Sequence, residues 1–325
     1  MTTKEKLLAL FEEHKGIYFS GEELADKLAL SRTAVWKGVN ALRSEGYVID
    51  AVPNRGYCLS EDTDILSAQG IQKYLNEACS SIQLNVLPEV TSTNSWLREK
   101  ANGGAREGCT VISGRQTAGR GRLGRSFYSP ENTGIYMSIL LRPEGITPDR
   151  AVKITTMAAA AACEAVREVS GRPAGIKWVN DIFIDGKKVC GILTEASLGM
   201  ENNSLEYAVL GIGINAYAPQ GGFPDEISRI AGSVFTERQK DGKNALAAAF
   251  LNHFMNYYIS KDHSVYVNKY RDMSLAIGKE INVISPEGQK KARALDVDDE
   301  CRLVVEYADG QKDCLSSGEI SIRLI

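Results

Sequence analysis

Residues 31–60 read SRTAVWKGVNALRSEGYVIDAVPNRGYCLS, and this stretch decides the fold of the N-terminal part of the chain. Ser31 is a typical N-cap residue, and Gly46 is a typical residue just past a helix end. The apolar residues that recur between them at helical spacing are Val35, Val39 and Leu42. Two strand-like runs follow, joined by the turn residues 53–56. The stretch therefore predicts a helix followed by a β-hairpin.

The preceding thirty or so residues complete this unit. Residues 1–15 carry apolar side chains at helical spacing, and Ser20 with Glu23 has the form of a capping box for a second helix. The order helix, helix, turn, helix, hairpin is that of a winged helix-turn-helix. We expect this domain to span residues 1–62.

Charge within this domain is local rather than global. Residues 1–60 hold eight basic and eight acidic side chains, so any contact with DNA must come from one patch. The third helix carries Arg32, Lys37 and Arg43 against Glu45 alone, and its N-terminal end is where a recognition helix meets bases and phosphates. The candidate DNA-binding residues are Ser31, Arg32, Thr33, Trp36, Lys37 and, at the tip of the hairpin, Arg55. The alternative is a small protein-interaction domain.

The remainder of the chain divides into two further regions. Residues 61–66 have the composition of a hinge, and from 67 to 272 strands alternate with helices, including a long helix from Asp149 to about Val169. Strands joined both by hairpins and by helices predict an α+β domain with a central mixed sheet. Residues 275–325 contain short strands between turn signals, which predicts a small SH3-like β barrel.

Composition limits the classes of function. The chain has 325 residues, a net charge of −3 and 43% hydrophobic residues, as expected of a globular protein. It has no apolar run long enough for a membrane span and no signal peptide, so we expect a cytoplasmic protein without a membrane partner. Seven cysteines without a CxxC pair, and three histidines without metal-ligand spacing, argue against a disulfide framework, a zinc site or histidine catalysis.

The stretch GRGRLGR at 119–125 is the densest chemical signal in the chain. Glycines let a backbone approach a ligand closely, and the guanidinium groups of Arg120, Arg122 and Arg125 suit phosphate or carboxylate. It is not a P-loop, because the GxxxxGK[ST] pattern is absent. From these residues alone, a solvated surface loop and a phosphate-binding loop remain open.

Three other segments carry polar groups or unusual glycines. Lys177 lies in a strand-like run before Asn180 and Asp181, and strand alternation lets it point inward or outward. The GIGIN stretch from Gly211 to Asn215 has two strand glycines, which suggests close packing against a ligand or a backbone. The STN stretch at 92–94 either caps a helix or supplies hydrogen bonds to a small ligand.

Together these four segments resemble the biotin protein ligases, and the N-terminal unit resembles that of the bifunctional members that also repress the biotin operon. The family loop GRGRxGR is present at 119–125, KWPNDI is present as KWVNDI at 177–182, GIGxN is present at 211–215 and STN at 92–94. The resemblance covers essentially the whole chain. It implies a protein that makes biotinoyl-5′-AMP from biotin and ATP and transfers biotin to a lysine of a biotin carboxyl carrier protein.

The resemblance also implies roles for individual residues. The residues implied to bind biotin are Ser92, Thr93, Asn94, Gln116, Arg120, Gly121, Arg122 and Lys177. Those implied to bind the nucleotide are Arg120, Arg122, Arg125, Asn180 and Asn215. Lys177, Arg120 and Arg122 are implied to be catalytic, and Asp181 to handle Mg²⁺. This chemistry needs no protein nucleophile, because cations that neutralise the carboxylate and the phosphates suffice.

Val179 departs from the family pattern, which has proline at this position. Proline would fix the backbone, whereas valine keeps an extended preference. We expect activity to be retained with a less rigid turn.

Two competing interpretations remain. One is a transcription factor whose ligase-like domain only senses a small molecule, and the other is an acyl ligase of the related lipoate class. The first is disfavoured by Lys177 and the three loop arginines, and the second by GRGRxGR together with the winged helix. For a ligase and repressor, we hypothesise that biotinoyl-5′-AMP orders residues 115–125 and favours a homodimer that binds operator DNA.

Overall fold

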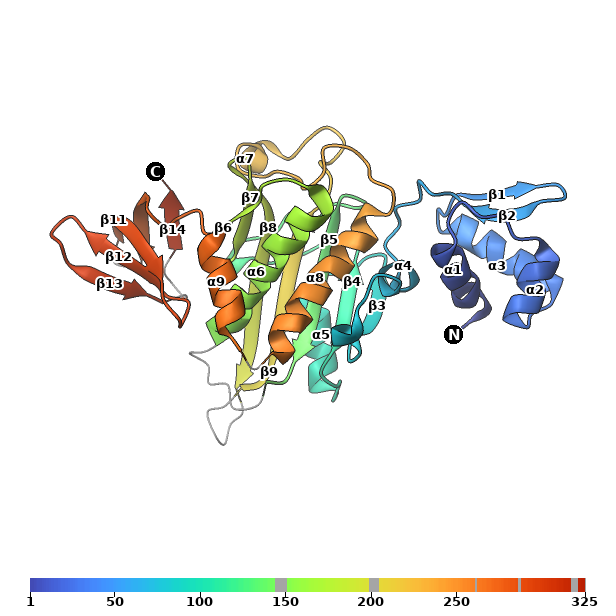
Figure 1. Ribbon diagram of the computed structural model, residues 1–325, viewed down its shortest axis with the longest axis horizontal. Coiled ribbons are helices and arrows are strands. Elements are labelled where there is room, and N and C mark those ends of the chain that lie inside the picture. The colour runs from blue at the N-terminus through green and yellow to red at the C-terminus, as the bar shows by residue number, and fades with distance from the viewer. Residues whose placement is uncertain (144–150, 199–204, 261, 286–287, 317–320, 325) are drawn as a thin grey trace. The chain divides into compact units, whose positions relative to one another are not determined.

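The computed structural model describes residues 1–325 except 144–150, 199–204, 261, 286–287, 317–320 and 325 (Figure 1). The chain forms two compact units. One consists of Met1–Leu75 and Glu237–Ala248, and the other of Asn76–Thr236 and Ala249–Ile325. Each unit is described by itself below. No helix in the described ranges is long and apolar enough to cross a membrane.

The first unit begins with the predicted winged helix-turn-helix. Its elements are α1 (Thr3–Glu13), α2 (Gly21–Leu28), α3 (Arg32–Ser44), β1 (Ile49–Val52) and β2 (Gly56–Leu59). Ser20 and Glu23 form the predicted capping box of α2, and the Ser31 side chain caps α3 by accepting from the N–H of Ala34. Val35, Val39 and Leu42 are buried in one core with side chains of α1 and α2, so the helical spacing was interpreted correctly.

A second part of this unit buries charges beside its apolar side chains, such as Ile71 and Leu246. Here α4 (Ala68–Gln72) packs with α1, and Asp241 lies directly before α8 (Gly242–Ile259). Four side chains, at most 19% exposed, form what we call the buried charge cluster. Its members are Glu12, Lys15, Lys73 and Asp241.

The second unit is built on a mixed sheet, as predicted. Within the described residues it has seven strands in the order β3-β4-β5-β9-β8-β7-β6. Their bounds are β3 Gln83–Leu87, β4 Cys109–Ser113, β5 Gly134–Leu141, β6 Gly175–Lys177, β7 Asp181–Ile184, β8 Lys187–Leu198 and β9 Leu205–Asn215. The β3–β4 pair is parallel and the other neighbouring pairs are antiparallel. Asp185 and Gly186, both at positive φ, form the predicted turn between β7 and β8.

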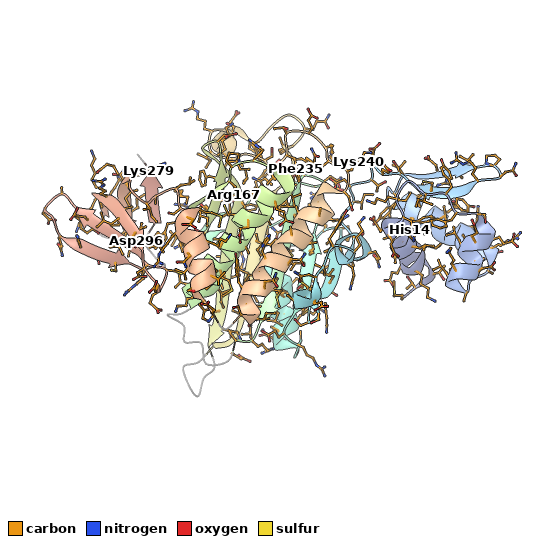
Figure 2. All side chains as sticks on the ribbon, in the orientation of Figure 1. His14, Arg167, Phe235, Lys240, Lys279 and Asp296 are labelled. Carbon is orange, nitrogen blue, oxygen red and sulfur yellow. The ribbon has the colours of Figure 1, made fainter. Side chains whose placement is uncertain are left out.

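Side-chain alternation along the strands separates two faces of this sheet. Thr194 on β8 contacts Thr155 of α6 (Ala151–Ser170), with 2.7 Å between their hydroxyl oxygens. The neighbouring Leu193 and Glu195 point to the other face, where α5 (Thr93–Asn102) packs. Helix α6 lies across the sheet beside α9 (Ser264–Asp272) in Figure 1. Arg167 ties the end of α6 to the sheet by donating to the carbonyl of Ala174 at 2.6 and 2.8 Å (Figure 2).

The C-terminal region contains short strands, as predicted, and they form one antiparallel sheet. Its strands are β10 (Glu280–Ser285), β11 (Gly288–Val297), β12 (Leu303–Tyr307), β13 (Lys312–Leu315) and β14 (Ser321–Leu324). They pair in the order β13-β12-β11-β10-β14, and in the described part of the chain the two outer strands do not pair with each other. Strand β13 was not predicted, because its residues KDCL lack an apolar alternation.

Two predicted details fall outside the described residues, namely the start of the long helix at Asp149 and the turn at 286–287. The remaining elements are short. They are η1 (Glu77–Cys79), η2 (Arg122–Gly124) and α7 (Asp225–Ser228).

Candidate ligand pocket and DNA-binding face

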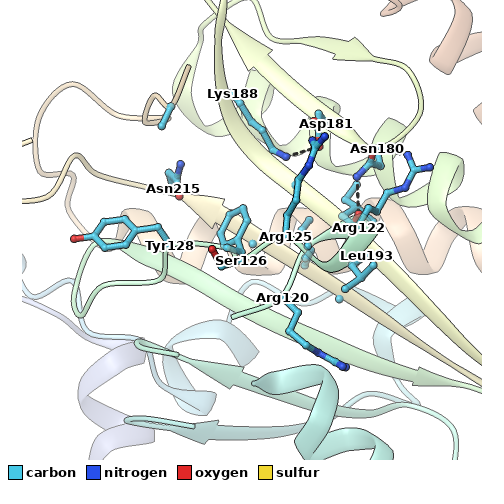
Figure 3. A pocket seen from close by; sticks show the side chains of 18 of the residues that line it. Arg120, Arg122, Arg125, Ser126, Tyr128, Asn180, Asp181, Lys188, Leu193 and Asn215 are labelled. Carbon is cyan, nitrogen blue, oxygen red and sulfur yellow. Dashed lines mark hydrogen bonds and ion pairs between the residues drawn. The ribbon is translucent and has the colours of Figure 1, made fainter. Parts of the chain in front are cut away.

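A pocket of about 300 Å³ lies on the α5 side of the large sheet (Figure 3). Residues from all four singled-out segments line it, although these segments are as far apart in the chain as Ser92 and Asn215. Its lining also includes apolar residues, among them Phe127, Leu193 and Phe223. The fold therefore gathers the predicted site residues around one cavity.

The STN stretch caps a helix, which confirms one of its two interpretations, and it also lines the pocket. Ser92 is the N-cap of α5. The N–H and hydroxyl of Thr93 both donate to Gln116 Oε1, at 2.9 and 3.1 Å. Asn94 Oδ1 lies 2.6 Å from Ser138 Oγ, and Asn94 Nδ2 donates to the carbonyl of Leu193 at 3.3 Å. These side chains are buried and oriented by their neighbours, as a precise ligand site requires.

The two glycines of GIGIN make room for side chains rather than for a backbone. A Cβ at Gly211 would lie 2.1 Å from Asn94 Oδ1, and one at Gly213 would lie 2.4 Å from the ring of Phe127. A Cβ at Gly191 on β8 would also meet that ring, at 3.2 Å. The glycines thus let Asn94 and Phe127 lie directly against the strands, where both line the pocket.

Residues Gly119–Phe127, which we call the arginine loop, form a tight hairpin. The N–H of Gly121 donates to the carbonyl of Arg125 at 2.7 Å, and that of Phe127 donates to Gly119 at 2.9 Å. Its arginines point in different directions in Figure 3. Arg122 Nη1 donates to Asn180 Oδ1 at 3.1 Å, and Arg120 Nη2 contacts both oxygens of Glu195, at 2.9 and 2.6 Å. The loop therefore contributes Arg120 and Arg122 to the pocket lining, while its tip, from Leu123 to Ser126, is exposed to solvent.

Lys177, at the end of β6, lines the pocket, which settles the direction that strand alternation left open. Its Nζ lies 5.5 Å from the centroid of the Phe183 ring. Trp178 and Val179, the next two residues, are hydrogen-bonded to distant parts of the chain. Trp178 Nε1 donates to the carbonyl of Cys301 at 3.3 Å, and the Tyr270 hydroxyl donates to the carbonyl of Val179 at 3.1 Å. The peptide bond between Trp178 and Val179 is cis.

Asn180, Asp181 and Asn215 also line the pocket. Asn180 Nδ2 donates to the carbonyl of Ile192 at 2.8 Å, and Asn215 Nδ2 donates to that of Gly232 at 3.0 Å. Asp181 Oδ1 lies 2.6 Å from Lys188 Nζ, an ion pair that is close but poorly aligned as a hydrogen bond. Among the described residues, no three histidine, cysteine or carboxylate side chains gather where a metal could bind.

Cations dominate the electrostatics of the pocket. Five cationic side chains line it, and among the described lining residues Asp181 is the one carboxylate. The cations are Arg120, Arg122, Arg125, Lys177 and Lys188. Burial lowers the pKa of Arg122, against the opposing effect of Asp181. Such an excess of positive charge beside apolar walls favours an anionic ligand that also has an apolar part.

Sequence reasoning missed several residues of this site, among them Phe127 and Lys188 in the pocket lining and Glu195 beside it. Lys188 and Glu195 face the pocket side from β8, a strand that was predicted but whose register was not. Alternation from Leu193 would have placed Glu195 on the same face, whereas no local signal marked Phe127.

The predicted DNA-binding residues are all exposed on the surface of the first unit. Ser31, Arg32, Thr33, Trp36 and Lys37 are exposed at the start of α3, with Trp36 at 57%. Arg55, at the tip of the hairpin, lies 4.2 Å above the Tyr18 ring. Arg32 pairs with Glu22 at 2.7 Å, in a contact open to solvent.

Comparison with known families gives three matches along the chain. The Biotin/lipoate A/B protein ligase family matches residues 86–215, an HTH domain matches 3–58, and the biotin protein ligase C-terminal domain matches 276–323. The first match contains every predicted pocket residue, and the second contains every predicted DNA-binding residue.

Individual relatives agree with this division. The chain is 34% identical to the bifunctional ligase/repressor BirA of Bacillus subtilis strain 168, covering 97% of this chain and 98% of the relative. It is 30% identical to the biotin–[acetyl-CoA-carboxylase] ligase of Mycobacterium tuberculosis, over 73% and 88% of the two chains.

A solved structure is similar as well. The biotin protein ligase from Aquifex aeolicus in complex with biotin and ATP is 27% identical, with a TM-score of 0.63 over 75% of this chain and 99% of that one. With a relative of 34% identity matched along almost its full length, this chain belongs to the family of bifunctional biotin protein ligases and repressors.

Proposed function

We propose that this protein activates biotin with ATP and transfers it to a lysine of a biotin carboxyl carrier protein. The observation that carries the proposal is the excess of cations around a partly apolar pocket. The biotin carboxylate attacks the α-phosphorus of ATP, which forms biotinoyl-5′-AMP and releases pyrophosphate. The carrier lysine amine then attacks the acyl carbon, forms an amide and releases AMP.

The pocket residues divide between the two substrates in this proposal. Ser92, Thr93, Asn94 and Gln116 bind the ureido ring of biotin. Thr93 and Gln116 fix each other's orientation, and Ser138 fixes that of Asn94. Lys177, Arg120 and Arg122, with the backbone of Gly121, neutralise the carboxylate and the α-phosphate as they approach. Arg125, Asn180 and Asn215 bind the nucleotide. The two anions repel each other in water, so cations fixed around them lower the barrier.

Mg²⁺ fits this site only as a partner of ATP. Asp181 supplies one carboxylate, and the described residues offer no further acidic group beside it, so phosphates and water would provide the other ligands. The role of Mg²⁺ would be to neutralise phosphate charge. Lys188, which faces Asp181, would share that role.

The decisive test is exchange of radioactive pyrophosphate into ATP by the purified full-length chain. We expect exchange that depends on biotin and Mg²⁺. Exchange with lipoate and not with biotin would instead identify a lipoate-type ligase. No exchange with either, while biotin still binds, would identify a transcription factor that only senses its ligand.

We also propose that the first unit binds operator DNA and that biotinoyl-5′-AMP acts as corepressor by favouring a homodimer. The exposed face with Trp36 and Lys37 supports this proposal, since a recognition helix needs such a face. Analytical ultracentrifugation with biotin and ATP should show a larger mass than without them, together with tighter operator binding. An unchanged mass and unchanged operator binding would contradict it.

The remaining assignments are proposals of the same kind. We retain a DNA-binding domain at 1–62, a catalytic domain at 67–272 and a C-terminal β domain at 275–325, in a cytoplasmic protein. The three family matches fall within these bounds.

A further inference from the structure

Glu195 lies beside the pocket and not among the residues that line it. It is on β8, two residues beyond Leu193, and its side chain is 28% exposed. Its carboxylate accepts hydrogen bonds from three side chains. Asn94 Nδ2 donates to one oxygen at 2.8 Å, Arg98 Nη2 donates to the other at 2.8 Å, and Arg120 contacts both. One carboxylate therefore joins α5, the STN stretch and the arginine loop.

Arg120 is the point at which this carboxylate reaches the loop. Its backbone forms a bridge with Ser126 across the hairpin, so the position of Arg120 is tied to that of the whole hairpin. The carboxylate contacts only one of the three guanidinium nitrogens, Nη2, in the described contacts. Nε and Nη1 thus remain available for an anionic ligand.

The far side of the loop has a different attachment. There Arg122 donates to Asn180, and Figure 3 shows Arg120 and Arg122 directed to opposite sides. Glu195 accepts from Arg120 directly, whereas Arg122 donates to the neutral Asn180 and is also influenced by the charge of Asp181. A charge-assisted contact with two carboxylate oxygens is the stronger of the two kinds.

We propose that Glu195 is a positioning residue of the ligase: by holding Arg120, it favours the position of the arginine loop against the pocket wall, and the adenylate then completes this closure. By the same carboxylate it orients Asn94, so that closure of the loop and orientation of the biotin site depend on one group. The effect expected on enzyme kinetics rests on the proposed function, whereas the effect expected on the position of the loop does not. A closed loop keeps the acyl-adenylate from water and from escape.

The structural consequence is tested by trypsin on the ligand-free full-length protein, because trypsin cuts after Arg120, Arg122 and Arg125. Glu195→Gln keeps the size of the side chain and removes its charge. We expect the loop to be cut roughly threefold to tenfold faster, the range for loss of one to two such bonds. Cutting at the wild-type rate would overturn the proposal.

The matched control is Glu89→Gln. Glu89 pairs with Arg115 at 2.9 Å, just outside the arginine loop, with both side chains 48% exposed. We expect loop cleavage in this variant within twofold of wild type. An equal acceleration in both variants would mean that any nearby charge suffices, which also overturns the proposal.

A second route covers the case in which Glu195→Gln does not fold. Arg120→Gln removes the same contact from the loop side and leaves the sites after Arg122 and Arg125 for trypsin. We expect faster cleavage there too, and no further increase in the double variant, since both changes remove one interaction. Wild-type cleavage in a folded Arg120→Gln variant, or additive effects, would contradict the assignment.

The kinetic consequence separates positioning from a general structural role. In biotin-dependent exchange, Glu195→Gln should raise the KM for biotin roughly threefold to tenfold and lower kcat by a smaller factor. A fall in kcat at unchanged KM would overturn the proposal. If the wild-type protein shows no exchange at all, the proposed function fails, whereas the trypsin result still decides whether Glu195 holds the loop.

Discussion

Two groups of charges, the buried charge cluster of the first unit and the pocket of the second, differ in how they are balanced. The cluster has two carboxylates and two lysines: Lys15 reaches Asp241 at 2.9 Å, and Lys73 reaches Glu12 at 2.9 Å and Asp241 at 2.6 Å. The pocket is lined by five cations and, in the described lining, one carboxylate.

The difference teaches which charges serve the fold and which serve a ligand. Charges that leave water need partners, and the cluster supplies them from within the chain. The pocket has fewer carboxylates than cations, so an anionic ligand completes its balance. Removing a charge from the pocket should therefore lower activity, whereas removing one from the cluster should lower the free energy of unfolding.

The largest effect is expected from Lys177→Ala. Loss of this pocket cation should lower biotin-dependent exchange on the order of 100-fold or more, because a charge that stabilises the reacting phosphate is gone. The free energy of unfolding should hardly change. Lys187→Ala is the matched control, since Lys187 is exposed and does not line the pocket. Exchange near the wild-type rate in Lys177→Ala would refute its role.

The next effect is on stability and comes from the cluster. Asp241 also accepts from the Tyr74 hydroxyl at 2.9 Å and from Asn244 Nδ2 at 2.7 Å, and its side chain is 6% exposed. Asp241→Asn leaves two buried lysines short of a negative partner, which should cost about 3 kcal/mol of unfolding free energy, measured by urea denaturation of the full chain.

Glu61→Gln is the control for Asp241→Asn. Glu61 pairs at 2.7 Å with Lys240, the neighbour of Asp241, but both side chains are more than half exposed. Its denaturation midpoint should stay within error of wild type. Equal losses in the two variants would show that burial does not set the value of these ion pairs.

The sequence predicted the pocket much better than the cluster, and the reason is physical. GRGRLGR, KWVNDI, STN and GIGIN are local patterns whose residue types are unusual for their settings, so each is visible in a short window. The partners in the cluster are as far apart as Lys15 and Asp241, and each looks like an ordinary surface charge in its own window. Only the folded chain, in which α4 packs on α1 and Asp241 reaches Lys15 and Lys73, brings them together.

The same limit explains the site residues that were missed. Strand alternation could place Glu195 on a face, but it could not show that Arg120 and Arg98 meet it there. The direction of Lys177 likewise needed the end of β6 and the pocket to be known. The winged helix was predicted almost to the residue, because caps and helical spacing are local.

A smaller effect is expected from Gly211→Ala, which disturbs pocket geometry without removing a charge. The new Cβ would lie 2.1 Å from Asn94 Oδ1, and Asn94 is held by Ser138, Leu193 and Glu195. Displacing it should cost about 1–2 kcal/mol of biotin affinity, as overpacking usually does. Calorimetric titration with biotin measures it.

Gly232→Ala is a suitable control for Gly211→Ala. A Cβ there would meet the Cβ of Lys187 at 2.8 Å, on a side chain that does not line the pocket. Biotin affinity should be close to wild type in this control. If Gly211→Ala also binds biotin as wild type does, Asn94 has room to move, and its fixed orientation is not needed for binding.

The most gradual effect is the dependence of stability on pH, and it belongs to the cluster. Burial alone would raise the pKa of Asp241, but hydrogen bonds from Asn244, Lys73 and Lys15 outweigh it and lower that pKa below its ordinary value of 3.8. Burial alone would lower the pKa of Lys73, but its bonds to Asp241 and Glu12 outweigh it and raise that pKa above 10.5.

The signs of these two shifts give the shape of the profile. A lowered carboxylate pKa stabilises the folded state above pH 3.8, and this contribution is lost as the pH falls through the folded value. A raised lysine pKa stabilises the folded state below pH 10.5, and this contribution is lost as the pH rises through the folded value. Urea denaturation across this range should show the free energy of unfolding fall at both acid and alkaline pH. Asp241→Asn should make the fall at acid pH less steep. If Asp241→Asn loses stability at acid pH as steeply as the wild type does, other carboxylates cause that loss. The buried charge cluster would then not contribute to the stability of the folded state at acid pH.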